Sequence, residues 1–221
     1  MGGDLPRWPL ANVYTGCMIG SHGMVSIAEA VAKGQAGKLN LTFVYGLMKA
    51  TGTTPRRNGG RPYVADYLKH GYVPSEDDFE AASLTLAYSF DDSAIAAVAA
   101  HLGLDDDAAH FSARSQSAYR ALWSPTDALM CPRSRGGALA CPSALEARTP
   151  YPLEKNYTEG DALQWLWFVP HDPEGLVALF GDNASFVAKL GGFIADSRTP
   201  AQGGKWPYGT VLANGWCVPE T

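Results

Sequence analysis

Apolar residues recur along most of the chain at intervals of three and four positions, which is the period of a helix with one buried face. Eight segments show this pattern: Met24 to Lys33, Leu41 to Ala50, Tyr63 to Leu68, Ala81 to Leu102, 105–125, Asp161 to Phe168, Asp172 to Phe180 and Asn183 to Ala195. No segment shows the strict alternation that is typical of a half-buried strand. The pattern therefore predicts an all-α fold.

Glycine, proline and aspartate mark the ends of several of these helices. Asp172 is placed to cap a helix, and Pro173 then occupies its first turn. We also expect Asp105 or Asp106 to cap the helix that runs towards residue 125, and Pro62 to open the short third helix. Glycines that directly follow a periodic segment predict where helices end: Gly34, Gly103 and Gly181.

Long stretches without any period separate the helices. Residues 1–20, 51–62, 125–152 and 197–221 are rich in glycine, proline, threonine or tryptophan, which indicates loops. Loops this long inside a compact domain commonly carry function. Helical hairpins joined by such loops favour an α/α toroid or a helical array over a four-helix bundle. No shift in composition marks a boundary, so we expect a single domain over residues 1–221.

Charge and composition narrow the class of protein. The 221 residues carry 17 Lys+Arg and 22 Asp+Glu, a net charge of −5, without a basic cluster, so we expect no nucleic-acid or anionic-membrane partner. No apolar run approaches the ~18 residues that a membrane-spanning helix needs. No signal peptide is visible at the start of the chain, and the compartment stays open. The 6 tryptophans and 10 tyrosines offer flat faces that match a sugar ring, although such residues also fill cores.

The four cysteines leave two possibilities open. None forms a CxxC pair or has a histidine at zinc-ligand spacing. Cys131 and Cys141 flank a short loop, so they either form a disulfide in an oxidising compartment or remain buried thiols.

Glu159 is the strongest candidate for acid–base chemistry. It lies in a loop that enters a helix, with Tyr157, Trp165 and Trp167 nearby in the sequence. Aromatic neighbours would remove water from the carboxyl and raise its pKa, as a general acid near neutral pH requires. An exposed position at the start of a helix would instead lower the pKa through the helix dipole. The sequence leaves both alternatives open.

Aspartates and histidines elsewhere give weaker signals. Asp91 and Asp92 are adjacent on the long helix and point about 100° apart, so we expect one to bind or cap and the other to lie at the surface. His22 and His171 have no serine or cysteine at a recognisable nucleophile elbow, so no catalytic triad is predicted. His171 precedes a helix, where a structural role is common.

Several separated stretches resemble the catalytic domain of glycoside hydrolase family 92, the calcium-dependent exo-α-mannosidases. They occur in the family's order: LPRWPLAN from Leu5, TGCMIGSH from Thr15, HGYVP from His70, LAYSFDD from Leu86, NYTEGDALQW from Asn156 and FVPHDPEGL from Phe168. The resemblance implies an (α/α)6 barrel, which agrees with the helical pattern. It also implies an inverting mechanism, in which one carboxylic acid protonates the leaving oxygen and a second carboxylate activates water.

The resemblance assigns roles to particular residues. Glu159 occupies the position of the general acid, and Gln164 is a candidate ligand of the family's calcium ion, which takes oxygen ligands. Four further residues are candidate contacts to the sugar: Arg7, Trp8, His22 and His171. The implied substrate is a mannose-containing N-glycan, and members of the family are often secreted or periplasmic.

The chain also departs from the family's pattern. The Asp-rich motif of the general base and the Asn-Glu-Pro motif before it do not occur in residues 1–221. We therefore expect part of a barrel, completed by the missing barrel half or by another chain. Three hypotheses follow: an exo-α-mannosidase or a piece of one, an inactive glycan-binding remnant, and a truncated gene product without independent function.

Overall fold

The computed structural model describes residues 3, 5–7, 9–10, 13–14, 18–55, 60–77, 80–143 and 156–196. These residues form eight helices: α1 (Gly23–Ala32), α2 (Leu41–Thr53), α3 (Val64–His70), α4 (Ala81–His101), α5 (Asp105–Arg120), α6 (Ala162–Trp165), α7 (Pro173–Leu179) and α8 (Asn183–Asp196). Four strands of two residues each form two antiparallel pairs: β1 (Pro9–Leu10) with β2 (Val13–Tyr14), and β3 (Trp123–Ser124) with β4 (Leu129–Met130). The predicted helical fold is confirmed. The strands were not predicted, because two residues are too few to show alternation.

One of the three predicted helix starts is confirmed, and two are wrong. Asp172 caps α7, accepting a hydrogen bond from the backbone N–H of Gly175 at 2.9 Å, with Pro173 in the first turn as predicted. The cap prediction for α5 is wrong, because Leu104 precedes the helix and Asp105 already lies inside it. The prediction for Pro62 is also wrong. Tyr63, in a left-handed conformation with φ of 53°, separates it from α3.

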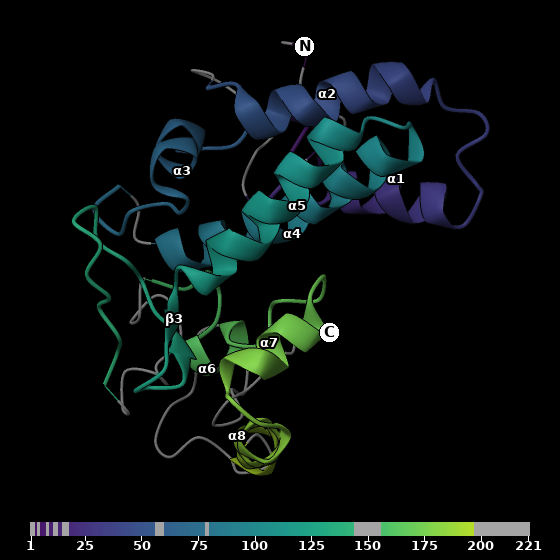
Figure 1. Cartoon of the computed structure of the whole chain (residues 1–221). Coiled ribbons are helices and arrows are strands. Elements are labelled where there is room, and N and C mark those ends of the chain that lie inside the picture. The colour runs from purple at the N-terminus through teal and green to yellow at the C-terminus, as the bar shows by residue number, and fades with distance from the viewer. Residues whose placement is uncertain are drawn as a thin grey trace.

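Helix α4 is the centre of the described structure. It packs along its length against α5, and α1 and α2 cover its C-terminal half (Figure 1). Sixteen of its 21 residues are buried, and each of the three buried hydrophobic clusters includes some of them. A helix buried on nearly all sides must carry apolar or small residues all round, which explains the alanine-rich sequence of α4.

A short hairpin follows α5, in which β3 pairs with β4. A disulfide joins Cys131 to Cys141 across the next loop, so the predicted pairing of these two cysteines is confirmed. The Tyr157 hydroxyl donates a hydrogen bond to the carbonyl oxygen of Met130 at 2.7 Å. The hairpin is thus tied to the segment that carries Glu159.

Helix α8 contrasts with α4. It contacts α7, and Trp167 packs against its Phe186 and Phe193. No residue of α8 whose burial is described is fully buried, and Val187 and Ile194 on it are 63% and 44% exposed. None of the described helices is both long and apolar enough to cross a membrane.

Candidate functional site

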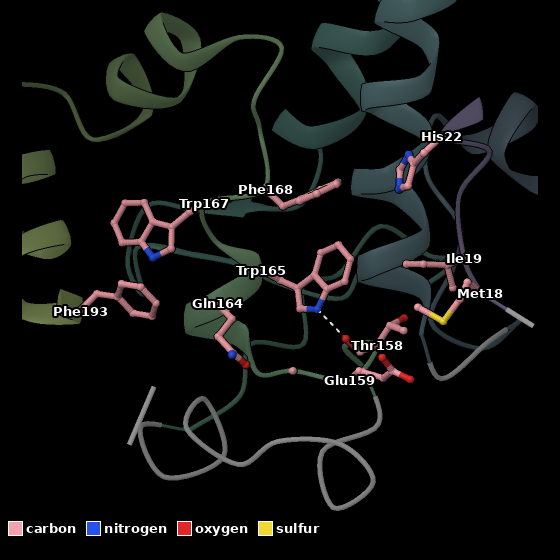
Figure 2. Close-up of a pocket in the computed structure, with 11 residues that line it drawn as sticks. Met18, Ile19, His22, Thr158, Glu159, Gln164, Trp165, Trp167, Phe168 and Phe193 are labelled. Carbon is pink, nitrogen blue, oxygen red and sulfur yellow. Dashed lines mark hydrogen bonds between the residues drawn. The ribbon is translucent and has the colours of Figure 1, made fainter. Parts of the chain in front are cut away.

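A pocket of about 450 Å³ opens between the segment before α1, the residues around α6 and the C-terminal part of α8 (Figure 2). Most of its wall is apolar or aromatic, and it includes one carboxylate and one imidazole. Its lining residues are Met18, Ile19, His22, Thr158, Glu159, Gly160, Gln164, Trp165, Trp167, Phe168 and Phe193. An aromatic wall with few polar groups is typical of a site for a small, partly apolar ligand such as a sugar.

Glu159 lies on the tight turn that leads into α6. Asp161 caps this helix through a reciprocal capping box with Gln164, in which the Gln164 amide oxygen accepts from the Asp161 backbone N–H at 2.9 Å. Glu159 has a φ of 46°, in the left-handed region that few residues other than glycine adopt. Glu159 is exposed at the edge of the pocket, where its side chain lies beside Thr158 (Figure 2).

His22 enters the same pocket from the start of α1. Its Nδ1 lies 2.9 Å from Oδ1 of Asp91, which is fully buried, while 42% of the His22 side chain is exposed. Burial opposes protonation, but the hydrogen bond and charge of Asp91 outweigh it and raise the pKa of His22 above its ordinary value. Because a carboxylate only accepts, Nδ1 carries a proton. In the charged form of the ring, Nε2 carries a proton as well and is a second N–H donor.

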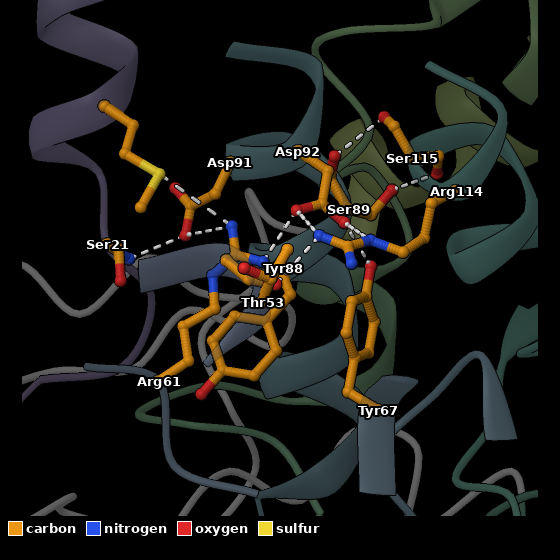
Figure 3. Close-up of polar contacts among 12 residues, drawn as sticks. Ser21, Thr53, Arg61, Tyr67, Tyr88, Ser89, Asp91, Asp92, Arg114 and Ser115 are labelled. Atoms are coloured by element: carbon orange, nitrogen blue, oxygen red, sulfur yellow. Dashed lines mark hydrogen bonds and ion pairs between the residues drawn. The ribbon is translucent and has the colours of Figure 1, made fainter. Parts of the chain in front are cut away.

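Asp91 and Asp92 are both fully buried, so the prediction that one lies at the surface is wrong. The two carboxylates do diverge as predicted, but Arg61 lies between them and contacts both (Figure 3). Asp91 also accepts a hydrogen bond from the Ser21 backbone N–H at 2.7 Å. The two acids therefore connect α4 to the segment that carries His22.

Asp92 belongs to a dense network of buried polar groups. It accepts hydrogen bonds from Arg61 at 2.6 Å, from Arg114 at 2.7 and 2.8 Å, and from the Tyr67 hydroxyl at 2.8 Å (Figure 3). Burial favours the neutral acid, but the two guanidinium groups outweigh it and hold the pKa of Asp92 below its ordinary value. This network was not predicted from the sequence, because its members are spread over three helices and a loop.

His171 lies behind the pocket wall and is not among its lining residues. Its ring stacks on Phe90 and its Nε2 lies 3.0 Å from the Ser89 hydroxyl, which donates its own hydrogen to the Ser115 carbonyl. Nε2 therefore carries a proton and donates to Ser89. Burial lowers the pKa of His171 to about 4, so the ring is neutral at pH 7. Its predicted sugar contact stays a prediction.

The two remaining sugar-contact candidates lie at the start of the chain. Trp8 is outside the described residues. Arg7 is half-buried and is not among the residues that line the pocket. The backbone N–H of nearby Leu5 bonds to Thr51 of α2 at 2.9 Å. The structure thus brings Glu159, His22 and Gln164 together, but not Arg7 or His171.

A calcium ion needs six to eight oxygen ligands, several of them carboxylates. Gln164 lines the pocket, and its side-chain oxygen accepts a hydrogen bond from the Asp161 backbone N–H. Among the described residues, three ligand groups of the His, Cys, Asp or Glu type come together only at Asp127, Cys131 and Cys141, where the cysteines form the disulfide. The described residues thus do not complete a calcium site around Gln164, whose role as a ligand stays a prediction.

Several lining residues were not predicted as site residues. Met18 and Ile19 lie within the TGCMIGSH stretch that carries the resemblance, but no pattern marked either of them, or Phe193, for the pocket. All three are far from Glu159 along the chain, and only packing brings them to the pocket. Phe168 and Trp167 are part of an aromatic run after Gln164, which the composition could have indicated.

Two solved structures are similar in fold to most of this chain. A family GH92 α-mannosidase from Bacteroides thetaiotaomicron in complex with mannoimidazole matches 87% of this chain with 30% identity and a TM-score of 0.76. A family GH92 inverting mannosidase from Bacteroides thetaiotaomicron VPI-5482 matches 96% of it with 29% identity and a TM-score of 0.76. The chain covers 25% and 28% of those two chains, so it spans about a quarter of their length.

Sequence comparison leads to the same family. No curated protein sequence matches the chain significantly. The sequence model of the glycosyl hydrolase family 92 catalytic domain, in contrast, matches residues 1–213 of the 221. The chain therefore belongs to the glycosyl hydrolase family 92 catalytic domain family.

Proposed function

We propose that this chain supplies the general acid and part of the sugar-binding wall of an α-mannosidase site that works with inversion. The observation that carries the proposal is the position of Glu159, whose carboxyl lines an aromatic pocket in a member of this family. The solved relatives support the substrate class, because one is described as an inverting mannosidase and another holds mannoimidazole. The proposed natural substrate is a mannose-containing N-glycan.

The pocket residues suggest a division of work. Protonated Glu159 donates its proton to the glycosidic oxygen as the bond to the leaving group breaks. Trp165 and Phe168, whose ring centroids lie 5.0 Å apart, offer faces on which the apolar side of a sugar ring packs. His22, held by Asp91, points its Nε2–H donor towards a sugar hydroxyl, and the raised pKa keeps that donor charged in mildly acidic solution.

An inverting reaction also requires a base, with the two carboxyl groups about 6.5–9.5 Å apart. Among the described residues that line the pocket, Glu159 is the one carboxylate, so the base is not among them. We propose that the base and the remaining calcium ligands come from the rest of the catalytic barrel or from another chain. When bound, calcium would polarise sugar hydroxyls.

Hydrolysis of an α-mannobiose tests this proposal, measured with calcium and with a chelator on the chain combined with the rest of its catalytic barrel. The sugar leaving group of this substrate needs the proton that a general acid supplies. We expect Glu159→Gln to lower kcat by about 10²–10⁴-fold, which is the usual contribution of a general acid. Glu174→Gln, at an exposed acid in the first turn of α7, is the matched control and should leave kcat unchanged. Proton NMR of the first product should show the β-anomer. A wild-type rate that Glu159→Gln leaves intact would contradict the assignment.

A second candidate function is glycan binding without hydrolysis. The observation that favours it is that the described pocket wall holds Glu159 without a second carboxylate. Titration calorimetry with mannose and with an α-mannobiose distinguishes the two functions. Binding that His22→Ala weakens, with no turnover even when the chain is combined with the rest of the barrel and calcium is present, would support this second function over the first.

A further inference from the structure

The turn that carries Glu159 is held through the backbone of the residue before it. The Thr158 backbone N–H donates a hydrogen bond to the Ser83 hydroxyl of α4 at 2.9 Å. The Thr158 carbonyl accepts one from the indole Nε1 of Trp165 in α6, also at 2.9 Å (Figure 2). Thr158 is 7% exposed and Ser83 is fully buried, so water does not compete for these two bonds. Side chains from two helices, α4 and α6, therefore hydrogen-bond to the backbone N–H and the backbone carbonyl of Thr158.

These two hydrogen bonds explain the otherwise unfavourable backbone conformation of the next residue, Glu159. Glu159 has a φ of 46°, and a non-glycine residue keeps such a conformation only where its surroundings impose it. The next residue, Gly160, is packed so closely that a Cβ atom there would lie 2.9 Å from the Gln164 side-chain oxygen and 3.2 Å from Trp165 Nε1. The turn is thus fixed on both sides of Glu159.

We propose that Ser83 and Trp165 are positioning residues for Glu159. Their hydrogen bonds fix the orientation of the Thr158 peptide groups, and this holds Glu159 in the left-handed conformation with its carboxyl at the pocket. When the Ser83 hydroxyl is removed, the Thr158 N–H loses its buried acceptor. The turn then relaxes, and the carboxyl leaves its place. The catalytic consequence rests on the proposed function of Glu159, whereas the conformational consequence does not.

Ser83→Ala in the full chain tests the inference, because Ser83 does not line the pocket. The matched control is Ser115→Ala, which removes another buried serine hydroxyl, bonded to the Ser89 carbonyl at 2.7 Å. Amide hydrogen exchange measured by NMR should be faster at Thr158 by about tenfold or more in Ser83→Ala. The ¹³Cα and ¹³Cβ shifts of Glu159, which report its backbone conformation, should move in the same variant. Neither readout should change in Ser115→Ala.

Kinetics provide a second readout on the same variants. With an α-mannobiose and the chain combined with the rest of its barrel, we expect Ser83→Ala to lower kcat by about tenfold or more with KM changed less than about twofold, since the acid is misplaced while the sugar wall remains. Trp165→Phe keeps an aromatic ring but loses the donor, so it should lower kcat and also alter KM, because Trp165 lines the pocket.

The outcomes separate this inference from the proposed function. Unchanged Thr158 exchange and Glu159 shifts in Ser83→Ala, or equal changes in Ser115→Ala, would overturn the positioning role. So would a normal kcat in Ser83→Ala when Glu159→Gln abolishes hydrolysis. If the wild-type chain combined with the rest of the barrel shows no hydrolysis, the proposed function fails, and the NMR readouts still decide whether Ser83 holds Glu159 in place.

Discussion

At the residue scale, two histidines beside one phenylalanine have opposite acid–base behaviour. His22 and His171 have ring centroids 5.9 and 5.8 Å from that of Phe90. His22 has a buried carboxylate partner, which raises its pKa, whereas His171 has a neutral hydroxyl partner and burial lowers its pKa to about 4. The partner of each ring therefore decides whether it is charged at mildly acidic pH.

The lowered pKa of His171 makes a prediction about stability in acid. The unfolded chain binds a proton near pH 6.5, but the folded chain resists it down to about pH 4, so His171 costs stability as pH falls through this window. His171→Gln keeps a donor for Ser89 and should abolish about 3 kcal/mol of that loss between pH 7 and pH 4. Urea unfolding at several pH values measures it.

The exposed His101 provides the matched control, and His101→Gln should leave the pH profile as in the wild type. The raised pKa of His22 acts in the opposite sense, because its contribution is fully present below about pH 6.5 and is lost as pH rises through the folded pKa. If the free energy of unfolding falls equally steeply from pH 7 to pH 4 in His171→Gln and in the wild type, folding does not lower the pKa of His171, and the prediction is wrong.

At the element scale, a buried ion pair joins α4 to α5. Arg114 of α5 forms two hydrogen bonds with Asp92 of α4, and its Nη2 also reaches the Gly52 carbonyl of α2 at 3.0 Å. Arg61, which precedes α3, completes the neutralisation of Asp92. Charges buried in this way must be matched, because an unmatched one lacks both water and a partner.

Asp92→Asn tests this arrangement. The change leaves two guanidinium groups facing an uncharged amide, and we expect it to lower the free energy of unfolding by about 3–5 kcal/mol. Glu29→Gln breaks the exposed pair between Glu29 and Lys33, whose side chains are 59% and 61% exposed. It should lower the free energy of unfolding far less, because water and salt screen an exposed pair. Denaturant unfolding compares the two variants. Similar losses would mean that the buried network contributes no more than a surface pair.

At the scale of the whole molecule, burial is unevenly distributed along the described chain. α4 contributes to all three buried clusters, whereas α8 meets the rest mainly through Phe186 and Phe193 on Trp167. Phe193 also lines the pocket. One wall of the candidate site therefore belongs to the least buried described helix, while Glu159 is anchored to the most buried one through Ser83.

This distribution predicts a gradient of local stability. Amides of α4 should exchange with solvent only through global unfolding, whereas those of α8 should exchange through local opening and orders of magnitude faster. Hydrogen–deuterium exchange followed by mass spectrometry measures both helices in one experiment. Binding of a mannose-containing ligand should slow amide exchange in α8 around Phe193, which lines the pocket. Equal protection of α4 and α8 would contradict the gradient.

Signals that act between near neighbours could be interpreted from the sequence alone. Helical periodicity located the eight helices, and Asp172 with Pro173 correctly marked the start of α7, because capping bonds join residues three positions apart. The resemblance to the family, and Glu159 as its candidate acid, also came from short local stretches. The single domain over residues 1–221 and closure of the barrel stay predictions.

Only the tertiary structure decided which groups meet. The sequence predicted that one of Asp91 and Asp92 is exposed, but both are buried. Their positions on a helix do not reveal that Arg61 contacts both carboxylates and that Arg114 contacts Asp92. The pocket likewise joins Met18, Glu159 and Phe193 across most of the chain. Burial and charge pairing depend on partners that are distant in sequence, whereas helix formation depends mainly on neighbours along the chain.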